Sequence, residues 1–290
     1  MAHRFALALA LVAGCSSNAI AAPPAKTDVK LVSIGESHSF VSDALGEERT
    51  INVYLPPNYS DPNRKFPVLY VVDGGLDQDF MHVVGTSHLG AIWARSQEVI
   101  VVGIATKDRR KELTAPTGNP ELLKEFPQAG YSGFFLKHLA EEVKPFIARS
   151  FRVNGQDAII GESLAGMFVV EAYLRQPDLF DAYAAISPSL WWDDQRLAKQ
   201  AEGLMKIRKK GTDPRLYLSI ANEGGDMQHG MDRVVRALHG RKNWCYTPRK
   251  AMRHDTIYHQ SMALVLQYLF PTDTPVAPES GFKIRCDKKG

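Results

Sequence analysis

The chain has 290 residues, of which 44% are hydrophobic and 23% charged, an ordinary composition for a soluble globular protein. Its net charge of +3 is spread thinly, and the two short basic clusters at 107–111 and 206–210 lack the aromatic interleaving of a nucleic-acid surface. We therefore expect no nucleic-acid partner, and an α/β fold of this length is often a single domain.

The N-terminal segment has the pattern of a targeting signal. Arg4 precedes an apolar stretch at 5–13 that is too short to span a bilayer. Residues 12–15 (VAGC) resemble the lipobox of bacterial lipoproteins, in which Cys15 would be lipidated, whereas residues 19–21 (AIA) fit an ordinary secretion site. We favour simple secretion slightly over lipidation. In either case we expect export to the periplasm or beyond, and no later segment is apolar enough for a transmembrane helix.

The composition along the chain predicts four parts: a signal segment at 1–22, a linker at 23–30, a globular domain at 31–270 and a tail at 271–290. Apart from Cys15, two cysteines remain. Because an exported protein folds under oxidising conditions, the even pair suggests one disulfide between Cys245 and Cys286, which would tie the tail to the region near Trp244. Two unpaired cysteines are the alternative.

The body of the chain alternates between expected strands and expected helices. Residues 50–55 alternate apolar and polar, as a half-buried strand does. Nearly continuous apolar runs, typical of strands buried on both faces, follow at 68–72, 99–104, 158–160, 183–186 and 216–220. Helices are expected at 135–147, 163–174, 227–238 and 261–269, with a kink or early end at Pro145. This alternation predicts a mostly parallel, doubly wound α/β sheet, with its chemistry beyond the carboxyl ends of the strands.

The run Gly161–Gly166 (GESLAG) follows the apolar strand at 157–160 and precedes a helix. A strand, a tight turn with one serine and a helix start form the layout of a nucleophile elbow, which predicts Ser163 as a nucleophile. Gly161 and Ala165 supply the small residues needed where the backbone doubles back, with Ala in place of the usual Gly. A bare match of this kind is frequent by chance, so an ordinary loop is the alternative.

A serine nucleophile needs a histidine base that is oriented by a carboxylate, and in α/β-hydrolases the acid and then the base follow the serine along the chain. Glu223 lies just past the strand at 216–220 and is the preferred acid, while Asp226 is the alternative and could instead cap the next helix. His254, at the start of the loop before the last helix, is the expected base. His259 is expected at a helix start or in a pocket wall.

An oxyanion hole needs two backbone N–H groups. Leu164, directly after the nucleophile, would give one, and Gly75 in the glycine turn after the strand at 68–72 would give the other. A plain strand-exit turn is the alternative for Gly75. The sequence has no HExxH motif, no Cys/His cluster at metal spacing and no GxGxxG motif, so we expect neither a metal nor a nucleotide cofactor.

Together these stretches resemble the putative esterase family of α/β-hydrolases, which includes enterochelin esterases, S-formylglutathione hydrolase, feruloyl esterases and mycolyltransferases. The resemblance covers about 45–270 and rests on the GESLAG elbow and on residues 45–49, 54–57, 67–74, 185–192 and 254–259. It implies an α/β-hydrolase fold, and it places Ser163, Glu223 and His254 where the family carries its catalytic triad.

The resemblance is greatest to the siderophore-esterase branch, where an arginine lies in a segment similar to R-x-x-D-x-T-P. Residues 109–116 resemble this segment, but Glu112 replaces the Asp and Ala115 is inserted. The resemblance implies a substrate-binding role for Arg109. Trp191 and Trp192 are candidates for an aromatic acyl or catecholate pocket, with core or lid packing as the alternative.

The expected function is therefore a serine carboxylic-ester hydrolase that acts on a small-molecule ester through an acyl-enzyme, with a periplasmic siderophore trilactone esterase as one candidate. The alternatives are a general or feruloyl-type esterase, an acyltransferase of the same fold, a peptidase, and an exported binding protein without activity.

Overall fold

A computed structural model describes residues 28–290 except 210, 212, 278–280 and 288–290. The expected signal segment, both expected cleavage sites and Cys15 lie outside the described residues. Residues 34–290 form one compact unit. Residues 28–33, the described part of the preceding unit, have no regular secondary structure.

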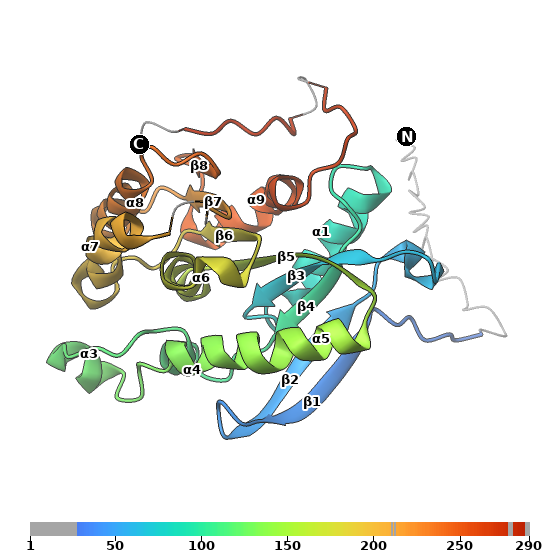
Figure 1. Cartoon of the computed structure of the whole chain (residues 1–290), viewed down its shortest axis with the longest axis horizontal. Helices are drawn as coiled ribbons and strands as arrows, with labels where there is room; N and C mark the ends of the chain where they lie inside the picture. Colours follow the sequence, from blue (N-terminus) through green and yellow to red (C-terminus); the bar gives the residue numbers. More distant parts are fainter. Residues whose placement is uncertain (1–27, 210, 212, 278–280, 288–290) are drawn as a thin grey trace, which may run out of the picture. The chain divides into compact units, whose positions relative to one another are not determined.

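The compact unit is built on a sheet of eight strands in the order β1-β2-β4-β3-β5-β6-β7-β8 (Figure 1). Strand β2 pairs antiparallel with β1 and β4, and all other neighbours are parallel. The predicted mostly parallel α/β sheet is therefore confirmed. The strands are β1 (Glu36–Ser42), β2 (Glu47–Tyr54), β3 (Phe66–Val72), β4 (Ile100–Ile104), β5 (Val153–Glu162), β6 (Ala182–Ile186), β7 (Arg215–Ile220) and β8 (Trp244–Pro248).

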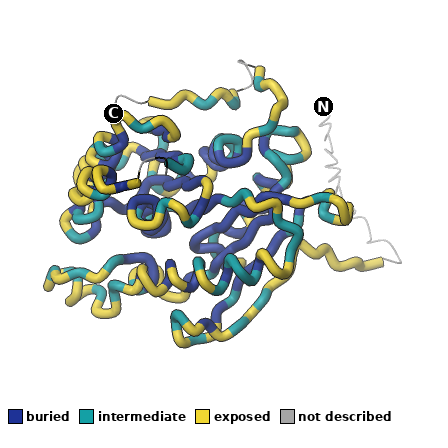
Figure 2. Tube along the Cα trace, viewed as in Figure 1, coloured by how far each residue is buried: buried dark blue, intermediate teal, exposed yellow. Residues whose placement is uncertain are grey.

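Helices cover both faces of the sheet, which explains why its central strands are apolar throughout. Helices α1 (Phe80–Ile92) and α9 (His254–Leu269) pack on one face. The other face carries α4 (Ser132–Lys137), α5 (Lys144–Ser150), α6 (Leu164–Arg175), α7 (Trp192–Ile207) and α8 (Gly225–Ala237). Short helices occupy the connections: α2 (Arg109–Glu112), α3 (Pro120–Glu125), and the 3-10 turns at Pro57–Ser60 and Pro177–Leu179. Figure 2 shows the buried strands as the dark centre of this arrangement.

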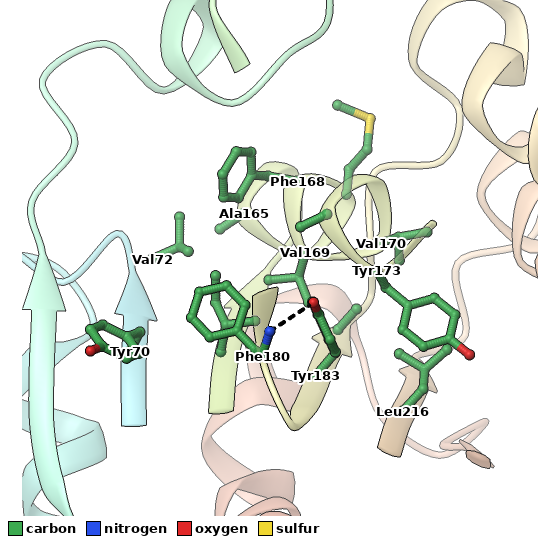
Figure 3. Packing of buried hydrophobic residues seen from close by; sticks show 14 of the residues in the cluster. Tyr70, Val72, Ala165, Phe168, Val169, Val170, Tyr173, Phe180, Tyr183 and Leu216 are labelled. Carbon is green, nitrogen blue, oxygen red and sulfur yellow. Dashed lines mark hydrogen bonds between the residues drawn. The ribbon is translucent and has the colours of Figure 1, made fainter. Parts of the chain in front are cut away.

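The core around α6 shows how aromatic residues fill the space between sheet and helix (Figure 3). The Tyr183 ring on β6 packs edge-on against Tyr173 and Phe180, with centroids 5.4 and 5.6 Å away. Its buried hydroxyl accepts a hydrogen bond from the Phe180 amide at 3.1 Å and donates to the Gln176 carbonyl at 2.9 Å. The buried phenol therefore keeps its hydrogen bonds, as buried tyrosines usually do.

Several elements differ from the sequence expectation. Strand β1 and helices α1 and α7 were not predicted, and α9 begins at His254 instead of near residue 261. The expected helix at 135–147 is present but interrupted, because a π-helical segment (His138–Val143) separates α4 from α5. Pro145 lies in the first turn of α5, where its missing N–H is tolerated.

Cys245 on β8 and Cys286 form a disulfide, as the cysteine count predicted. Their Cα atoms are 4.8 Å apart and the residues are separated by 41 positions. The bond joins the C-terminal segment to the outermost strand, where the Asp287 amide also donates to the Tyr246 carbonyl at 2.7 Å. In the part of the chain that the structure describes, no helix combines the length and apolar character needed to cross a bilayer.

Candidate active site

Ser163 lies on a sharp turn between β5, which ends at Glu162, and α6, which begins at Leu164. Its φ angle of 58° is unusual for a residue with a side chain and marks a strained backbone. A Cβ atom at Gly161 would come within 2.6 Å of the Ala165 backbone carbonyl, so only glycine fits there. The small residues of the GESLAG run thus allow the close turn that exposes the serine.

Two further residues with side chains adopt positive φ angles at the same edge of the sheet. Asp73 (φ 58°) directly follows β3, and Ser187 (φ 39°) directly follows β6. The carboxyl ends of parallel strands are the usual place for chemistry in such a sheet. Strained backbone at three neighbouring strand ends therefore points to this edge as the functional one.

Ser189 is a neighbour of Ser163 that sequence reasoning missed. The Ser163 Oγ and Ser189 Oγ atoms are 3.2 Å apart, and the Ser189 amide donates to the Ser163 carbonyl at 2.9 Å. Ser189 is only 3% exposed. Its only signal in the sequence is its place just after an apolar strand, in the run Ser187-Pro188-Ser189.

His254 and Glu223 meet at the same edge. The His254 Nδ1 and Glu223 Oε1 atoms are 2.7 Å apart. Glu223 is the third residue after β7, and its side chain is 12% exposed, whereas that of His254 is 42% exposed. The expectation that His254 lies in a loop was wrong: it is the first residue of α9. At the start of this helix the Arg253 amide donates to Thr256 Oγ1 at 3.1 Å.

The competing candidates for acid and base lie elsewhere. Asp226 is in the first turn of α8, where its exposed carboxylate accepts a hydrogen bond from Gln195 Nε2 at 2.9 Å. His259 lies in the second turn of α9, and its ring packs edge-on against His82 with centroids 4.8 Å apart.

The glycine turn after β3 is tightly packed. A Cβ at Gly74 would come within 2.3 Å of Gly103 on β4, so close strand packing requires glycine at that position. The Gly75 amide donates to Gln78 Oε1 at 2.9 Å, and Gln78 Nε2 in turn donates to the Thr106 hydroxyl at 3.0 Å. Leu164 is the first residue of α6, so its N–H points out of the helix end without an intrahelical acceptor.

Arg109 begins α2 beside this turn. Its Nε donates to Asp73 Oδ2 at 2.7 Å, and the Arg109 side chain is 43% exposed. The Thr106 hydroxyl also donates to Asp73. Glu112, which replaces the Asp of the family pattern, accepts two hydrogen bonds from the buried Arg49 at 2.8 and 2.9 Å.

A group of carboxyls lies behind the nucleophile. Burial raises the pKa of Glu162 to about 8, and the nearby Asp79, Glu223 and Asp73 carboxylates add to this while Arg109 opposes it. Burial and the charge of Asp73 raise the pKa of Asp79 to about 7. Protons therefore remain in this group near neutral pH.

The two tryptophans differ in their surroundings. Trp192 is 4% exposed and packs against Phe126, with ring centroids 5.8 Å apart, as a member of the core. The cavity that it lines measures about 20 Å³, which suits at most a water molecule. Trp191 is 38% exposed and packs edge-on against Trp192. Across the described ranges, no cluster of His, Cys, Asp and Glu side chains could hold a metal ion.

The chain is similar to known esterases. The family described as Putative esterase matches residues 42–255. The ferri-bacillibactin esterase BesA of Bacillus subtilis (strain 168) is 28% identical over 230 residues, which cover 72% of this chain and 74% of that protein. The siderophore triacetylfusarinine C esterase of Aspergillus fumigatus is 26% identical over 204 residues, covering 63% of this chain and 65% of that protein.

Solved structures show the same fold. An IroE-like serine hydrolase from Shewanella oneidensis superposes with a TM-score of 0.71 at 25% identity, covering 81% of this chain and 80% of that one. The BES protein from Bacillus cereus gives a TM-score of 0.73 at 20% identity, covering 86% of this chain and 100% of that one.

The sheet, its helices and these matches define the class: the protein is a carboxylic-ester hydrolase of the α/β-hydrolase fold. Within that class, the chain belongs to the putative esterase family.

Proposed function

We propose that this esterase works through a Ser163–His254–Glu223 triad and an acyl-enzyme. The proposal rests on one observation: His254 Nδ1 lies 2.7 Å from Glu223 Oε1 at the sheet edge that carries the strained Ser163. A hydrogen bond from Nδ1–H to the carboxylate leaves Nε2 as the acceptor for a proton, which is the tautomer that a general base needs.

In the proposed reaction, His254 takes the Ser163 proton while Oγ attacks the ester carbonyl. The carbonyl carbon then releases the alcohol oxygen, which receives that proton from His254. Water, deprotonated by His254, attacks the acyl-enzyme, and the acid leaves as Ser163 regains its proton. In the structure Ser163 Oγ is hydrogen-bonded to Ser189 Oγ. The Ser163 hydroxyl therefore has to turn toward His254 when substrate binds, because catalytic hydrogen bonds often tighten only in the complex.

The N–H groups of Leu164 and Gly75 would stabilise the oxyanion. Leu164 is the first residue of α6, so its N–H has no intrahelical acceptor and is available for the oxyanion. The Gly75 amide donates to Gln78, so its participation requires the Gln78 side chain to release it.

Replacing Ser163 tests the proposal. Ser163→Ala should retain the fold and lose hydrolysis of p-nitrophenyl esters by at least about 1,000-fold, because nucleophile removal leaves only binding and oxyanion stabilisation. Ser150→Ala, at an exposed position on α5, is the matched control and should keep full activity. Full activity in a folded Ser163→Ala protein would refute the assignment.

For the substrate, we propose an exported esterase that opens the ester bonds of an iron-binding trilactone. The relatives named above are siderophore esterases, and Arg109 places an exposed cation at the catalytic edge, where it suits an anionic ferric catecholate. Export is supported by the N-terminal signal pattern and by the disulfide. We infer no cofactor.

A substrate panel tests this choice. Ferric and apo trilactones should be cleaved with a higher kcat/KM than feruloyl esters or p-nitrophenyl acetate. Arg109→Gln should raise KM for the ferric trilactone about 10-fold and leave the KM for the neutral p-nitrophenyl ester unchanged. Lys107→Gln, which removes one charge two positions before Arg109, should change neither KM. Preference for the feruloyl ester would instead favour an aromatic-ester esterase.

A further inference from the structure

A second cavity lies far from Ser163. It measures about 360 Å³ and lies where the end of α1 meets α9; it is lined by Thr86, Leu89, Gly90, Trp93, Arg95, Ser96, Ala263, Leu266 and Phe282. Helix α1 starts at the catalytic edge, and its thirteen residues carry the chain about 20 Å away from it. Helices α1 and α9 lie side by side along this path (Figure 1). The cavity is within the size range of small-molecule sites.

Two residues that line the cavity, Arg95 and Ser96, each carry a buried side-chain atom without a hydrogen-bond partner among the described residues: Arg95 Nη1 and Ser96 Oγ. Ser96 is only 4% exposed. Leaving a buried donor or hydroxyl unpaired costs free energy, so such atoms in a native protein usually mark a missing partner.

The backbone holds these two residues in the wall. After α1 the chain turns back at Ala94 (φ 51°), and the Arg95 amide donates to the Gly90 carbonyl at 2.8 Å. A Cβ at Gly90 would come within 2.6 Å of Ser96 Oγ, so the hydroxyl rests directly on the glycine. Both polar groups are therefore positioned by the fold itself.

The rest of the wall is mainly apolar. Leu89 is 56% exposed and Trp93 66% exposed, while Leu266 on α9 is buried. The Arg95 guanidinium lies 5.8 Å from the centre of the Phe282 ring. Within the described ranges, Arg95 forms no salt bridge, in contrast to Arg49, Arg64 and Arg109. The cavity thus joins an apolar wall to one uncompensated cation and one free hydroxyl.

We propose that this cavity binds an apolar monocarboxylate. The apolar body would lie between Leu89, Trp93 and Leu266, and the carboxylate would accept hydrogen bonds from Arg95 and Ser96. Charge-assisted hydrogen bonds to a guanidinium are strong, and they would satisfy both orphaned atoms at once.

Calorimetric titration of the exported protein with 1-naphthylacetate tests the proposal, with the neutral 1-naphthylacetamide as the matched ligand. The acid should bind at least 10-fold more tightly than the amide. Arg95→Met should abolish that preference, Ser96→Ala should weaken acid binding several-fold, and Ala263→Phe, which fills the cavity, should remove binding of both ligands.

Arg149→Met, an equal loss of charge at an exposed position on α5, is the control and should bind as the wild type does. All variants should first give the wild-type thermal transition, within a few degrees. The proposal is overturned if the acid fails to bind at millimolar concentration, if folded Ser96→Ala and Arg95→Met bind it unchanged, or if Ala263→Phe still binds it.

Discussion

Two carboxylates follow β7, three positions apart in the chain, and their surroundings differ. The Glu223 side chain is 12% exposed and contacts the His254 ring. Asp226 is 70% exposed and contacts Gln195 and, at 3.8 Å, His229. Of the two, Glu223 is the one that contacts His254, and it does so from a largely buried position.

Glu223→Gln should therefore lower kcat by about 1,000-fold to 10,000-fold, because an amide neither stabilises the imidazolium nor enforces the productive tautomer. Asp226→Asn should change kcat less than about 2-fold. Steady-state kinetics on a p-nitrophenyl ester measure both effects. The opposite order of effects would transfer the acid role to Asp226.

Glu162, the residue before the nucleophile, should make the protein less stable as pH rises. Its pKa is about 8 in the folded state, well above the ordinary value of 4.5, so between about pH 5 and 8 the folded state holds a proton that the unfolded chain has lost. Stability rises with pH only where the unfolded state binds more protons, so here it falls across this window. Asp79, with a pKa of about 7, acts in the same direction.

Glu162→Gln should remove part of this decline. We expect its Tm to match the wild type near pH 5 and to exceed it by at least about 2–4 °C at pH 9, as a difference of 1 kcal/mol or more would give. Glu48→Gln, at an exposed position on β2, should leave the wild-type pH dependence unchanged. Parallel Tm curves for Glu162→Gln and wild type would contradict the raised pKa.

At the scale of elements, the short helix α2 is attached to the sheet through one buried ion pair. Arg49 on β2 is 1% exposed and the Glu112 side chain 4% exposed, and Arg49 also donates to the Ala105 carbonyl at 2.6 Å. The same four-residue helix carries Arg109. The ion pair therefore positions the arginine that faces the catalytic edge.

Arg49→Met should destabilise the protein by about 3–5 kcal/mol, because it leaves the Glu112 carboxylate buried without its partner. The double variant Arg49→Met/Glu112→Leu should recover a large part of that loss, since it buries no unpaired charge. Urea unfolding measures both. If the single and double variants lose the same free energy of unfolding, the stability comes from packing of the Arg49 stem and not from the charge pair.

The elements that could be predicted from the sequence are those with a local signal. Apolar runs identified the central strands, and the Gly161–Gly166 run identified the turn at Ser163, because both depend on neighbours in the chain. Strand β1 (ESHSFVS) was missed because it is a largely exposed edge with few apolar residues. Helix α1 was missed because its glycines, valines and threonine give it weak helix propensity, so its packing against α9 decides its structure.

The candidate site is likewise predicted where the signal is local and missed where it depends on tertiary contacts. The turn at Ser163 is encoded locally. Other features of the site depend on residues that only the tertiary fold brings together: the Ser163–Ser189 hydrogen bond, the hydrogen bond from the Gly75 amide to Gln78, and the raised pKa of Glu162. The core position of Trp192 likewise depends on Phe126, sixty-six positions earlier in the chain. No pattern in a single sequence reports such contacts.

At the scale of the whole molecule, the disulfide joins the C-terminal segment to β8 across 41 positions. A crosslink of this span lowers the entropy of the unfolded chain and stabilises the fold by about 4 kcal/mol in the loop-closure model. Reduction of the wild-type protein should therefore lower the urea midpoint. The double variant Cys245→Ser/Cys286→Ser should unfold at that lower midpoint and should not respond to reductant. Unchanged stability on verified reduction would show that the tail adds nothing to the fold.

The central claim is that Ser163 is the nucleophile, and covalent trapping tests it most directly. After reaction with a fluorophosphonate and tryptic digestion, residues 153–175 form one peptide, in which Ser163 is the only serine or threonine. We predict a stoichiometric phosphonyl adduct on this peptide by mass spectrometry, and its absence from Ser163→Ala. An adduct on the next peptide, residues 176–196, which contains Ser187 and Ser189, or no adduct on a protein that still hydrolyses esters, would contradict the account.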